Sequence, residues 1–354
     1  MKKSILMITS NNHKGGIHSS SIALFRELSR DFEIELVFFG RNVEESEVDL
    51  NGTLLVIRKI FEFSKITLFL ARLFQLIKFM HQKRIDFVIC QDPSSTVLGY
   101  FLGYLKREIQ IVAMCHVPNS LLTSIDKLII RKLYSKQKAV VVPSVFLANE
   151  VAEIAPWITP LVIPNMMPQV ATYCEWPREK SIEQDFYIFF GRLEPEKNPI
   201  FFVEMAKRDP KNIYVLCGLG SQLPLLETFV SKNLISNVIF LGDQPISRFV
   251  NKASLMVIPS LTEAFGIVAI ESWLQGVPTI VSTQAQGVVE MMSDTRLGAS
   301  MSLEQNSGDW IKIAESVSRN SLTDDAIRRV LEKYHASAII SRWQILIEDK
   351  GSTV

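Results

Sequence analysis

Two glutamates in the second half of the chain stand in a context that suggests ligand binding. The segment 259–271 holds a Pro-Ser turn, Glu263, a Phe-Gly pair and a helix-like stretch that includes Glu271, eight positions after the first glutamate. Gly266 would let the backbone approach a ligand at a helix start, where N–H groups without helical partners point outward. Glu271 would lie about a turn and a half inside that helix. We therefore expect the two carboxylates to contact different parts of one elongated ligand rather than to act as an acid–base pair.

Two cations precede this segment on a proline-containing loop. Arg192 and Lys197 follow directly after an apolar run at 186–190. Parallel α/β sheets bind ligands at the carboxyl ends of their strands, which makes this loop a candidate site. The guanidinium fork of an arginine and the point charge of a lysine can converge on one diphosphate. The alternative is that both are solvated loop side chains.

The elements that would position these residues follow from the hydropathy pattern. Short, nearly continuous apolar runs, typical of strands buried on both faces of a parallel sheet, alternate with helix-length amphipathic stretches. The expected strands are 4–9, 34–39, 53–57, 86–90, 109–115, 139–142 and 160–163, then 186–190, 212–217, 237–241, 255–258 and 278–281. Three prolines at 164, 168 and 177 separate the two series.

This pattern predicts an α/β protein with two doubly wound, Rossmann-like domains that face each other across a cleft. The expected N-terminal domain is 1–165, followed by a linker at 166–185 and a C-terminal domain at 186–354. The last helix is a candidate to cross back to the first domain.

Gly-Arg-Leu-x-x-x-Lys-Asn, followed by Glu-x-Phe-Gly-x-x-x-x-Glu, resembles the retaining Glu-x7-Glu glycosyltransferases, the family 4 group of the GT-B fold. The resemblance is specific over 186–292 and looser before. It implies that Arg192 and Lys197 hold the donor diphosphate and that Glu271 takes the ribose hydroxyls. It also implies that the transferred sugar is held by Glu263 together with the backbone N–H groups near Phe265, Gly266 and Ile267.

Three further matches are softer. The pair Gly15-Gly16 matches the family's phosphate-approaching loop, with a tight turn as the alternative. His116 matches a histidine that faces the donor sugar, with a satisfied buried histidine as the alternative. Gly218 and Gly220 match a Gly-x-Gly beside the nucleotide base.

The chain also departs from the family pattern at two places. Asn-Met-Met-Pro at 165–168 stands where the family often has Asn-Gly-Val-Asp, and Gln-Gly-Val-Val-Glu at 286–290 replaces the usual Gly-Gly-x-x-Glu loop. These differences concern the interdomain joint and the contacts to the donor sugar, and leave the expected diphosphate and ribose contacts in place.

The resemblance implies a retaining, hexose-type glycosyltransferase that uses a UDP- or GDP-sugar and a hydroxyl acceptor on a glycan or lipid-linked oligosaccharide, in bacterial surface polysaccharide synthesis. The chain has no Asp-x-Asp motif, so we expect cationic side chains, with no metal ion or cofactor, to bind the diphosphate. The alternatives are a nucleotide-sugar epimerase of the same architecture and a non-catalytic sugar-nucleotide-binding partner of a membrane complex. A dinucleotide oxidoreductase is disfavoured because no G-x-G-x-x-G follows an early strand.

Composition and charge bear on location and partners. The chain is 47% hydrophobic and 21% charged, which is typical of a globular protein and not of a disordered one. Its net charge is +1, yet residues 1–165 carry 20 basic against 15 acidic side chains. The amphipathic stretch 58–84 has seven Lys or Arg against one acid. It is either a core-facing crossover helix or a helix that contacts an anionic membrane. We expect a cytoplasmic protein, peripheral on the inner membrane, with no nucleic-acid partner.

Overall fold

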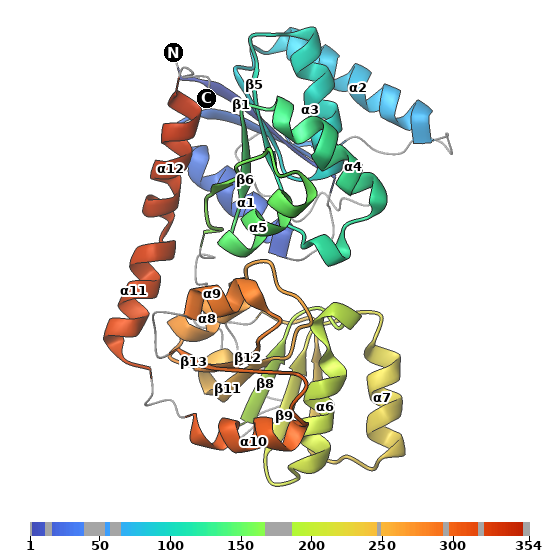
Figure 1. Ribbon diagram of the computed structural model, residues 1–354, viewed down its shortest axis with the longest axis vertical. Helices are drawn as coiled ribbons and strands as arrows, with labels where there is room; N and C mark the ends of the chain where they lie inside the picture. The colour runs from blue at the N-terminus through green and yellow to red at the C-terminus, as the bar shows by residue number, and fades with distance from the viewer. Residues whose placement is uncertain are drawn as a thin grey trace. The chain divides into compact units, whose positions relative to one another are not determined.

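The computed structural model describes residues 2–10, 16–38, 54–56, 65–166, 186–245, 249–292, 297–317 and 322–349, with backbone alone at 54–56 and 65–72. The chain divides into two compact units (Figure 1). Unit 1 comprises Met1–Met166 and Ala336–Val354, and unit 2 comprises Met167–His335. Residues from Ala336 onward therefore belong to the same unit as the N-terminal half.

Unit 1 is built on a parallel sheet whose described strands run in the order β3-β2-β1-β4-β5-β6-β7. The strands are β1 (Ser4–Thr9), β2 (Glu33–Phe38), β3 (Leu54–Val56), β4 (Phe87–Cys90), β5 (Gln110–Met114), β6 (Ala139–Val142) and β7 (Leu161–Val162). The helices are α1 (Gly16–Leu28), α2 (Lys65–Gln82), α3 (Pro93–Leu105), α4 (Ser124–Leu133), α5 (Val145–Ile154) and α12 (Ala336–Glu348).

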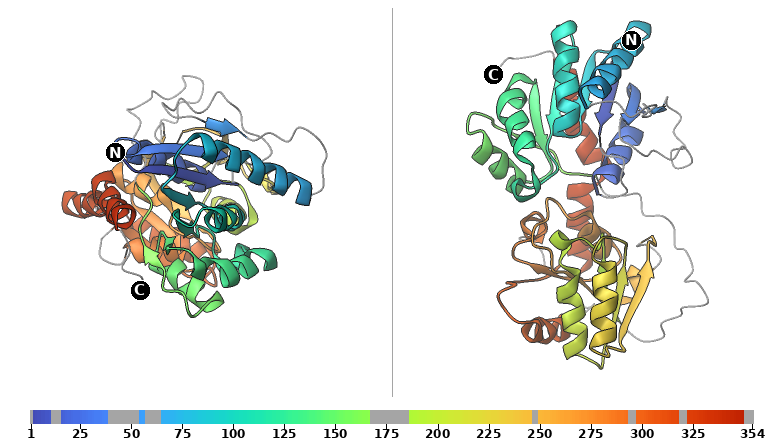
Figure 2. Two further views of the ribbon diagram at one scale, coloured as in Figure 1. Left: turned by 90° about the horizontal axis from the view of Figure 1, so that it is seen from above. Right: turned by 90° about the vertical axis from the view of Figure 1, so that its right-hand side faces the viewer.

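Both faces of this sheet are covered by helices (Figure 2). Ile5 and Met7 of β1 pack in one cluster with side chains of α1 and α12, including Trp343. The alternate residues Leu6 and Ile8 pack in another cluster with side chains of α2 and α3. Because successive side chains of a strand point to opposite faces, a strand covered on both sides must be apolar throughout. This is the reason for the continuous apolar runs in the sequence.

Unit 2 repeats this design. Its described strands run in the order β10-β9-β8-β11-β12-β13, again all parallel. They are β8 (Phe186–Phe190), β9 (Ile213–Cys217), β10 (Val238–Gly242), β11 (Ala253–Ile258), β12 (Thr279–Ser282) and β13 (Gly298–Met301). The helices are α6 (Pro199–Arg208), α7 (Leu223–Lys232), α8 (Ile267–Leu274), α9 (Gln286–Met292), α10 (Ser307–Ser316) and α11 (Asp324–Tyr334).

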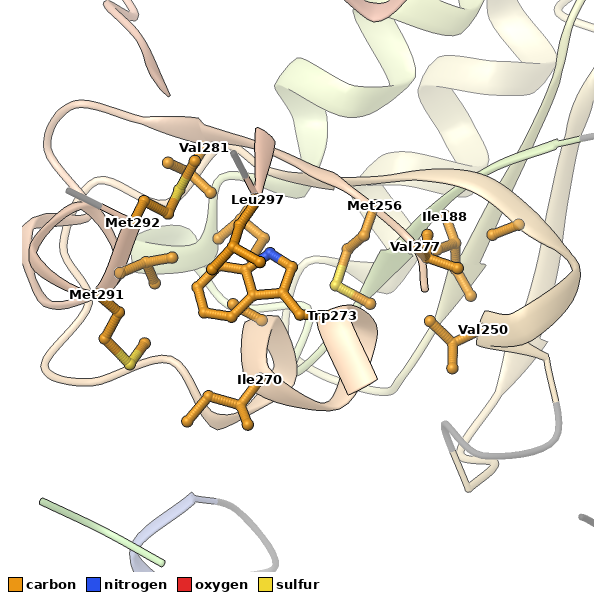
Figure 3. Packing of buried hydrophobic residues seen from close by; sticks show 14 of the residues in the cluster. Ile188, Val250, Met256, Ile270, Trp273, Val277, Val281, Met291, Met292 and Leu297 are labelled. Carbon is orange, nitrogen blue, oxygen red and sulfur yellow. The ribbon is translucent and has the colours of Figure 1, made fainter. Parts of the chain in front are cut away.

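Helix α8 is anchored in this unit by Trp273. The indole is fully buried and lies among Met256, Ile270 and Leu297 (Figure 3). Its Nε1–H donates to Thr279 Oγ1 over 3.1 Å, so the one polar atom of the ring is satisfied. The packing fixes the helix that carries Glu271.

With two parallel α/β sheets, each covered by helices, the prediction of two Rossmann-like domains is confirmed.

The amphipathic stretch 58–84 lies only in part within the described residues, where α2 begins at Lys65. Of the side chains described there, Leu76 and Met80 are buried against the sheet, whereas Phe74 is exposed. Contact of this stretch with a membrane stays a prediction. Among the helices that the structure describes, none combines the length and apolar character needed to cross a bilayer.

Candidate functional site

Three loops of unit 2 meet where neighbouring parallel strands end. They follow β9, β8 and β11, which are adjacent in the sheet, and they carry the residues singled out in the sequence. In a parallel sheet the carboxyl ends of adjacent strands lie on one edge, so the loops that leave them are neighbours. The chain thus brings Gly218, Arg192 and Glu263 to one sheet edge from positions far apart in the sequence.

Lys197 and Glu263 form an ion pair between the β8 and β11 loops. Ser260 Oγ lies 3.4 Å from the same carboxylate oxygen of Glu263. The two loops are also tied through the backbone, because the Leu261 N–H donates to the Glu196 carbonyl over 2.8 Å. The Lys197 side chain is only 22% exposed and that of Glu263 13%. Two residues predicted to bind different parts of one ligand are therefore in direct contact with each other.

Arg192 is held differently. Its guanidinium pairs with Glu196 Oε1 at 2.6 Å, within the β8 loop itself, and its side chain is 51% exposed. The same loop is fixed to the β9 loop by Glu194, whose carboxylate accepts from the Ser221 N–H at 3.0 Å and from its hydroxyl at 2.5 Å. Those two bonds lower the pKa of Glu194. The backbone beneath Arg192 is thus anchored, while its charged end remains open to solvent.

Gly218 and Gly220 allow the β8 and β9 loops to pack closely. A Cβ at Gly218, whose φ is +142°, would lie 1.9 Å from the Gly191 carbonyl oxygen, and one at Gly220 would lie 2.4 Å from the Leu193 oxygen. The Leu193 N–H donates to the Leu219 carbonyl over 2.8 Å across this contact. Both glycines are therefore required by the backbone, whatever ligand lies beside them.

Helix α8 begins at Ile267, after Gly266 with a φ of +83°. No side chain caps this start. A Cβ at Gly266 would lie 2.2 Å from Val288 Cγ2, so only glycine fits. The neighbouring Phe265 is buried and packs edge-on against Tyr334, with ring centroids 5.6 Å apart. The first N–H groups of α8 are thus presented at the sheet edge on a fixed backbone, next to Glu263.

Glu271 lies on α8, and its carboxylate has no hydrogen-bond or ion-pair partner among the residues that the structure describes. Burial raises the pKa of this carboxyl to about 7. A desolvated carboxylate without a donor is costly, and such groups are enriched at functional sites. The Glu271 carboxylate therefore has acceptor capacity that the described residues do not use.

Unit 1 holds the other predicted residues. Gly16 is the first residue of α1 and has open space where a Cβ would be, while Gly15 lies outside the described residues. His116 follows β5 and is buried, and its Nε2 lies 3.1 Å from Gln91 Oε1. Burial lowers the pKa of this histidine to about 4, so the ring is neutral at pH 7. His116 lines a small pocket within unit 1.

Comparison with known proteins shows two matches to glycosyltransferase families. The family "Glycosyl transferases group 1" matches residues 175–335, and "Glycosyltransferase Family 4" matches residues 14–167. Between them the two matches take in most of both units. The chain belongs to the glycosyltransferases of the GT-B fold.

Relatives and solved structures of this glycosyltransferase agree with the assignment. MJ1178 of Methanocaldococcus jannaschii, a glycosyltransferase, is 30% identical over 115 residues, which is 32% of each chain. YqgM of Bacillus subtilis, also a glycosyltransferase, is 25% identical over 76% of this chain and 79% of its own length. The crystal structure of Anabaena Alr3699/HepE in complex with UDP and glucose has a TM-score of 0.85 at 15% identity, covering 99% of this chain and 100% of that one.

Several polar residues of this glycosyltransferase were not singled out from the sequence. In unit 2 these are Glu194, Glu196 and Ser260, which fix or pair the predicted residues. In unit 1 the Asp92 carboxylate caps α3 by accepting from Ser95 N–H at 2.9 Å, and accepts from Ser10 N–H at 2.7 Å. Burial raises its pKa. The Asp-Pro pair after an apolar run signals a helix cap, but nothing in the sequence signals the bond to Ser10.

Proposed function

We propose that this protein is a retaining glycosyltransferase that moves a hexose-type sugar from a nucleotide sugar to a hydroxyl of a glycan or lipid-linked oligosaccharide. The observation that carries the proposal is the Lys197–Glu263 pair beside the uncapped start of α8, with the unpartnered Glu271 on the same helix. The cations are complementary to a diphosphate and the exposed N–H groups to the hydroxyls of a sugar. The unpartnered carboxylate is complementary to the hydroxyls of a ribose.

In this proposal the donor diphosphate binds to Lys197 and Arg192. As the bond to the anomeric carbon breaks, negative charge grows on the departing diphosphate, and fixed cations stabilise that charge more than they stabilise the bound donor. The donor diphosphate would replace Glu196 and Glu263 as the partner of these cations. Only side chains would have to move, and the backbone of the loops could stay as it is. The Glu263 carboxylate, with the N–H groups near Phe265, Gly266 and Ile267, would then hold the sugar hydroxyls.

Glu271 would accept hydrogen bonds from the ribose hydroxyls, which restores the solvation that the carboxylate lacks in the free protein. Gly218 and Gly220 would let the nucleotide base lie close to the backbone. In unit 1, His116 and the loop with Gly15 and Gly16 stay proposed contacts to substrate. The presence of UDP and glucose in the HepE complex supports a uridine nucleotide as the first donor to test.

Retention of configuration is proposed on the resemblance to the retaining Glu-x7-Glu glycosyltransferases. No carboxylate is assigned as a nucleophile, so the acceptor attacks on the same face that the diphosphate leaves. In that step the acceptor hydroxyl forms the new C–O bond, the anomeric C–O bond to the diphosphate breaks, and the leaving phosphate oxygen takes the acceptor's proton.

The test begins with thermal unfolding in the presence of UDP, GDP and their common sugar conjugates. A ligand at a hundred times its Kd stabilises the folded state by about 2.7 kcal/mol, which is readily measured. The selected donor is then incubated with glycan and lipid-linked acceptors, and NMR of the product reports the anomeric configuration. We expect retention and full activity in EDTA. An inverted product would remove the retaining assignment, and conversion of the sugar nucleotide without acceptor would indicate an epimerase instead.

A further inference from the structure

Helices α3 and α4 of unit 1 expose large apolar side chains on their outer side. The two helices pack side by side (Figure 1). The exposed side chains of α3 are Phe101, Tyr104 and Leu105, and those of α4 are Ile125 and Leu128. Residues three or four positions apart lie on the same side of a helix, so each set forms one stripe.

These stripes do not hold the helices on the sheet. The opposite side of α3 is buried through Leu98 and Leu102, which pack in the cluster that contains Leu6 and Ile8 of β1. Ile130 of α4 is likewise buried. Single exposed apolar residues are common on proteins, but a group of them on adjoining elements marks an interaction site. The outer side of α3 and α4 is therefore a candidate surface for a partner.

The charges around the stripes are mainly positive. Residues 93–136 hold six basic and two acidic side chains, which are Lys106, Arg107, Lys127, Arg131, Lys132 and Lys136 against Glu108 and Asp126. Asp126 accepts from the Thr123 hydroxyl over 2.6 Å in the cap of α4. Arg107, Lys132 and Lys136 are exposed. The Lys136 Nζ lies 5.1 Å from the ring centroid of Tyr100, so cations and aromatic rings share this surface.

We propose that the outer side of α3 and α4 binds an anionic lipid surface, with the exposed apolar side chains in the headgroup region and the basic side chains beside lipid phosphates. Helices with an apolar stripe and basic flanks lie in a membrane interface in this way. An aromatic ring with a polar atom, such as that of Tyr104, is favoured at the same level. A lipid leaflet is complementary to the whole surface, because it offers negative charge and apolar chains over a broad area.

This surface adds a partner to the function proposed above and rests on that function for its purpose, since a lipid-linked acceptor would be held in such a membrane. It is formed by α3 and α4, outside the stretch 58–84. Binding to lipid itself requires no nucleotide sugar, so the two proposals can be tested apart.

Sedimentation with lipid vesicles tests the surface directly. One set of vesicles contains phosphatidylcholine alone, and the other also contains the anionic lipid phosphatidylglycerol. We expect the protein to bind the anionic vesicles about tenfold more tightly or better, and the difference to shrink when added salt screens the charges. Equal binding to both sets, or no binding to either, would overturn the proposal.

Ile125→Ser and Ile345→Ser form a matched pair of variants. Both isoleucines lie on helices of unit 1 and are 70% and 71% exposed, but Ile345 belongs to α12, which packs on the other face of the sheet. Ile125→Ser should weaken vesicle binding by about fivefold, whereas Ile345→Ser should leave it unchanged. Both should keep the wild-type unfolding temperature, because exposed side chains contribute little to stability. Equal losses in the two variants would exclude α4 as the contact.

Lys132→Gln tests the charges, with Lys232→Gln of unit 2 as its control. Both lysines are exposed and lie in the last turn of a helix, α4 or α7. Loss of Lys132 should weaken binding to anionic vesicles by about fivefold at low salt and have little effect at high salt. Lys232→Gln should have no effect. Equal effects would indicate a general electrostatic attraction and contradict a defined surface.

Two other occupants of the surface are outcomes of further measurements. Sedimentation velocity without vesicles detects association between copies of the chain, and association that Ile125→Ser abolishes would assign the surface to a protein contact instead of lipid. Inorganic phosphate should compete with vesicles no more than sodium chloride of equal ionic strength does. Stronger competition would indicate a site for free phosphate and overturn the lipid assignment.

Donor binding is measured in parallel by thermal unfolding with UDP-glucose, and it should be unchanged in Ile125→Ser and Lys132→Gln. Binding of vesicles without binding of any nucleotide sugar would remove the proposed function and leave the surface in place. Sugar transfer to a soluble acceptor without vesicle binding would remove the surface alone.

Discussion

The loops of unit 2 and the pocket of unit 1 differ in whether their polar side chains are paired. In unit 2 the two cations are paired with carboxylates of the same unit, Lys197 with Glu263 and Arg192 with Glu196. In unit 1 the neutral Gln91 and His116 each keep a polar atom without a partner. An unpaired buried charge costs far more than an unpaired neutral group. The comparison indicates that the cations of unit 2 need a carboxylate partner in the free protein, whereas the neutral side chains of unit 1 can remain without a partner.

Glu271 differs from the other charged residues of unit 2 discussed above. Its carboxyl group has no partner in the described structure, and burial raises its pKa to about 7. At neutral pH the group is therefore divided between its neutral and charged forms. A ligand that donates to the carboxylate would shift this balance to the charged form.

The largest effect is expected from Lys197→Ala. The change removes the more buried of the two cations and leaves Glu263 without its partner. If the lysine stabilises the leaving diphosphate, kcat should fall by about 10²- to 10³-fold, with a smaller rise in donor KM. Steady-state kinetics measures both. Lys211→Ala is the control, because Lys211 forms an exposed pair with Glu315 in the same unit. Near-normal turnover in Lys197→Ala would reject the diphosphate site.

Gly218→Ala tests whether the close packing between the β8 and β9 loops of unit 2 excludes a side chain at this position. The new Cβ would meet the Gly191 carbonyl oxygen at 1.9 Å, and backbone cannot move as a side chain can. We expect a loss of about 3 kcal/mol in the free energy of unfolding, measured by denaturant titration. At Gly242 φ is also positive, at +71°, yet a Cβ there meets nothing within 4 Å. Gly242→Ala should cost only about 1 kcal/mol, and equal losses would contradict the close-packing argument.

The strands that carry the candidate site of unit 2 could be predicted from the sequence, because a run of apolar residues is a local feature. The apolar run 186–190 coincides with β8, and the strands expected at 212–217 and 255–258 overlap β9 and β11. It did not predict β13, since Gly-Ala-Ser-Met at 298–301 lacks the branched or aromatic residues that mark a strand. Nor could it predict the bonds of Gln91, whose partners come from α1 and from the end of β5. Local periodicity carries no information about such contacts. The roles of the site residues stay predictions.

Glu271→Ala should weaken donor binding by about 1.5–3 kcal/mol, which is the worth of hydrogen bonds to a charged group. Calorimetry with UDP measures the change, since the ribose is present without the sugar. Glu204→Ala, at an exposed position of α6, serves as a control for loss of an acid elsewhere in unit 2. Unchanged UDP affinity in Glu271→Ala would remove the ribose assignment.

The raised pKa of Glu271 also predicts a pH dependence. Between about pH 4.5 and pH 7 the folded protein holds a proton on this group that the unfolded chain has lost, so stability falls as pH rises through this window. Donor affinity should change in the opposite sense and rise toward pH 8, because the charged carboxylate is the better acceptor. In Glu271→Gln both trends should be reduced. Thermal unfolding and UDP titration at pH 5.5 and pH 8 give the two slopes, and parallel slopes would contradict the assignment.

The smallest effect is expected from Arg192→Lys. Arg192 is 51% exposed, against 22% for Lys197, and it pairs within its own loop. A lysine keeps the charge but loses the two-pronged hydrogen bond, so the loss in kcat/KM should correspond to about 0.5–1.5 kcal/mol. An exposed position also weakens each charge interaction, because water screens it. Kinetics of Arg192→Lys beside Arg192→Ala would separate charge from geometry. If Arg192→Lys were as damaging as Lys197→Ala, the arginine would have to become buried on donor binding, and the ranking by exposure in the free protein would be wrong.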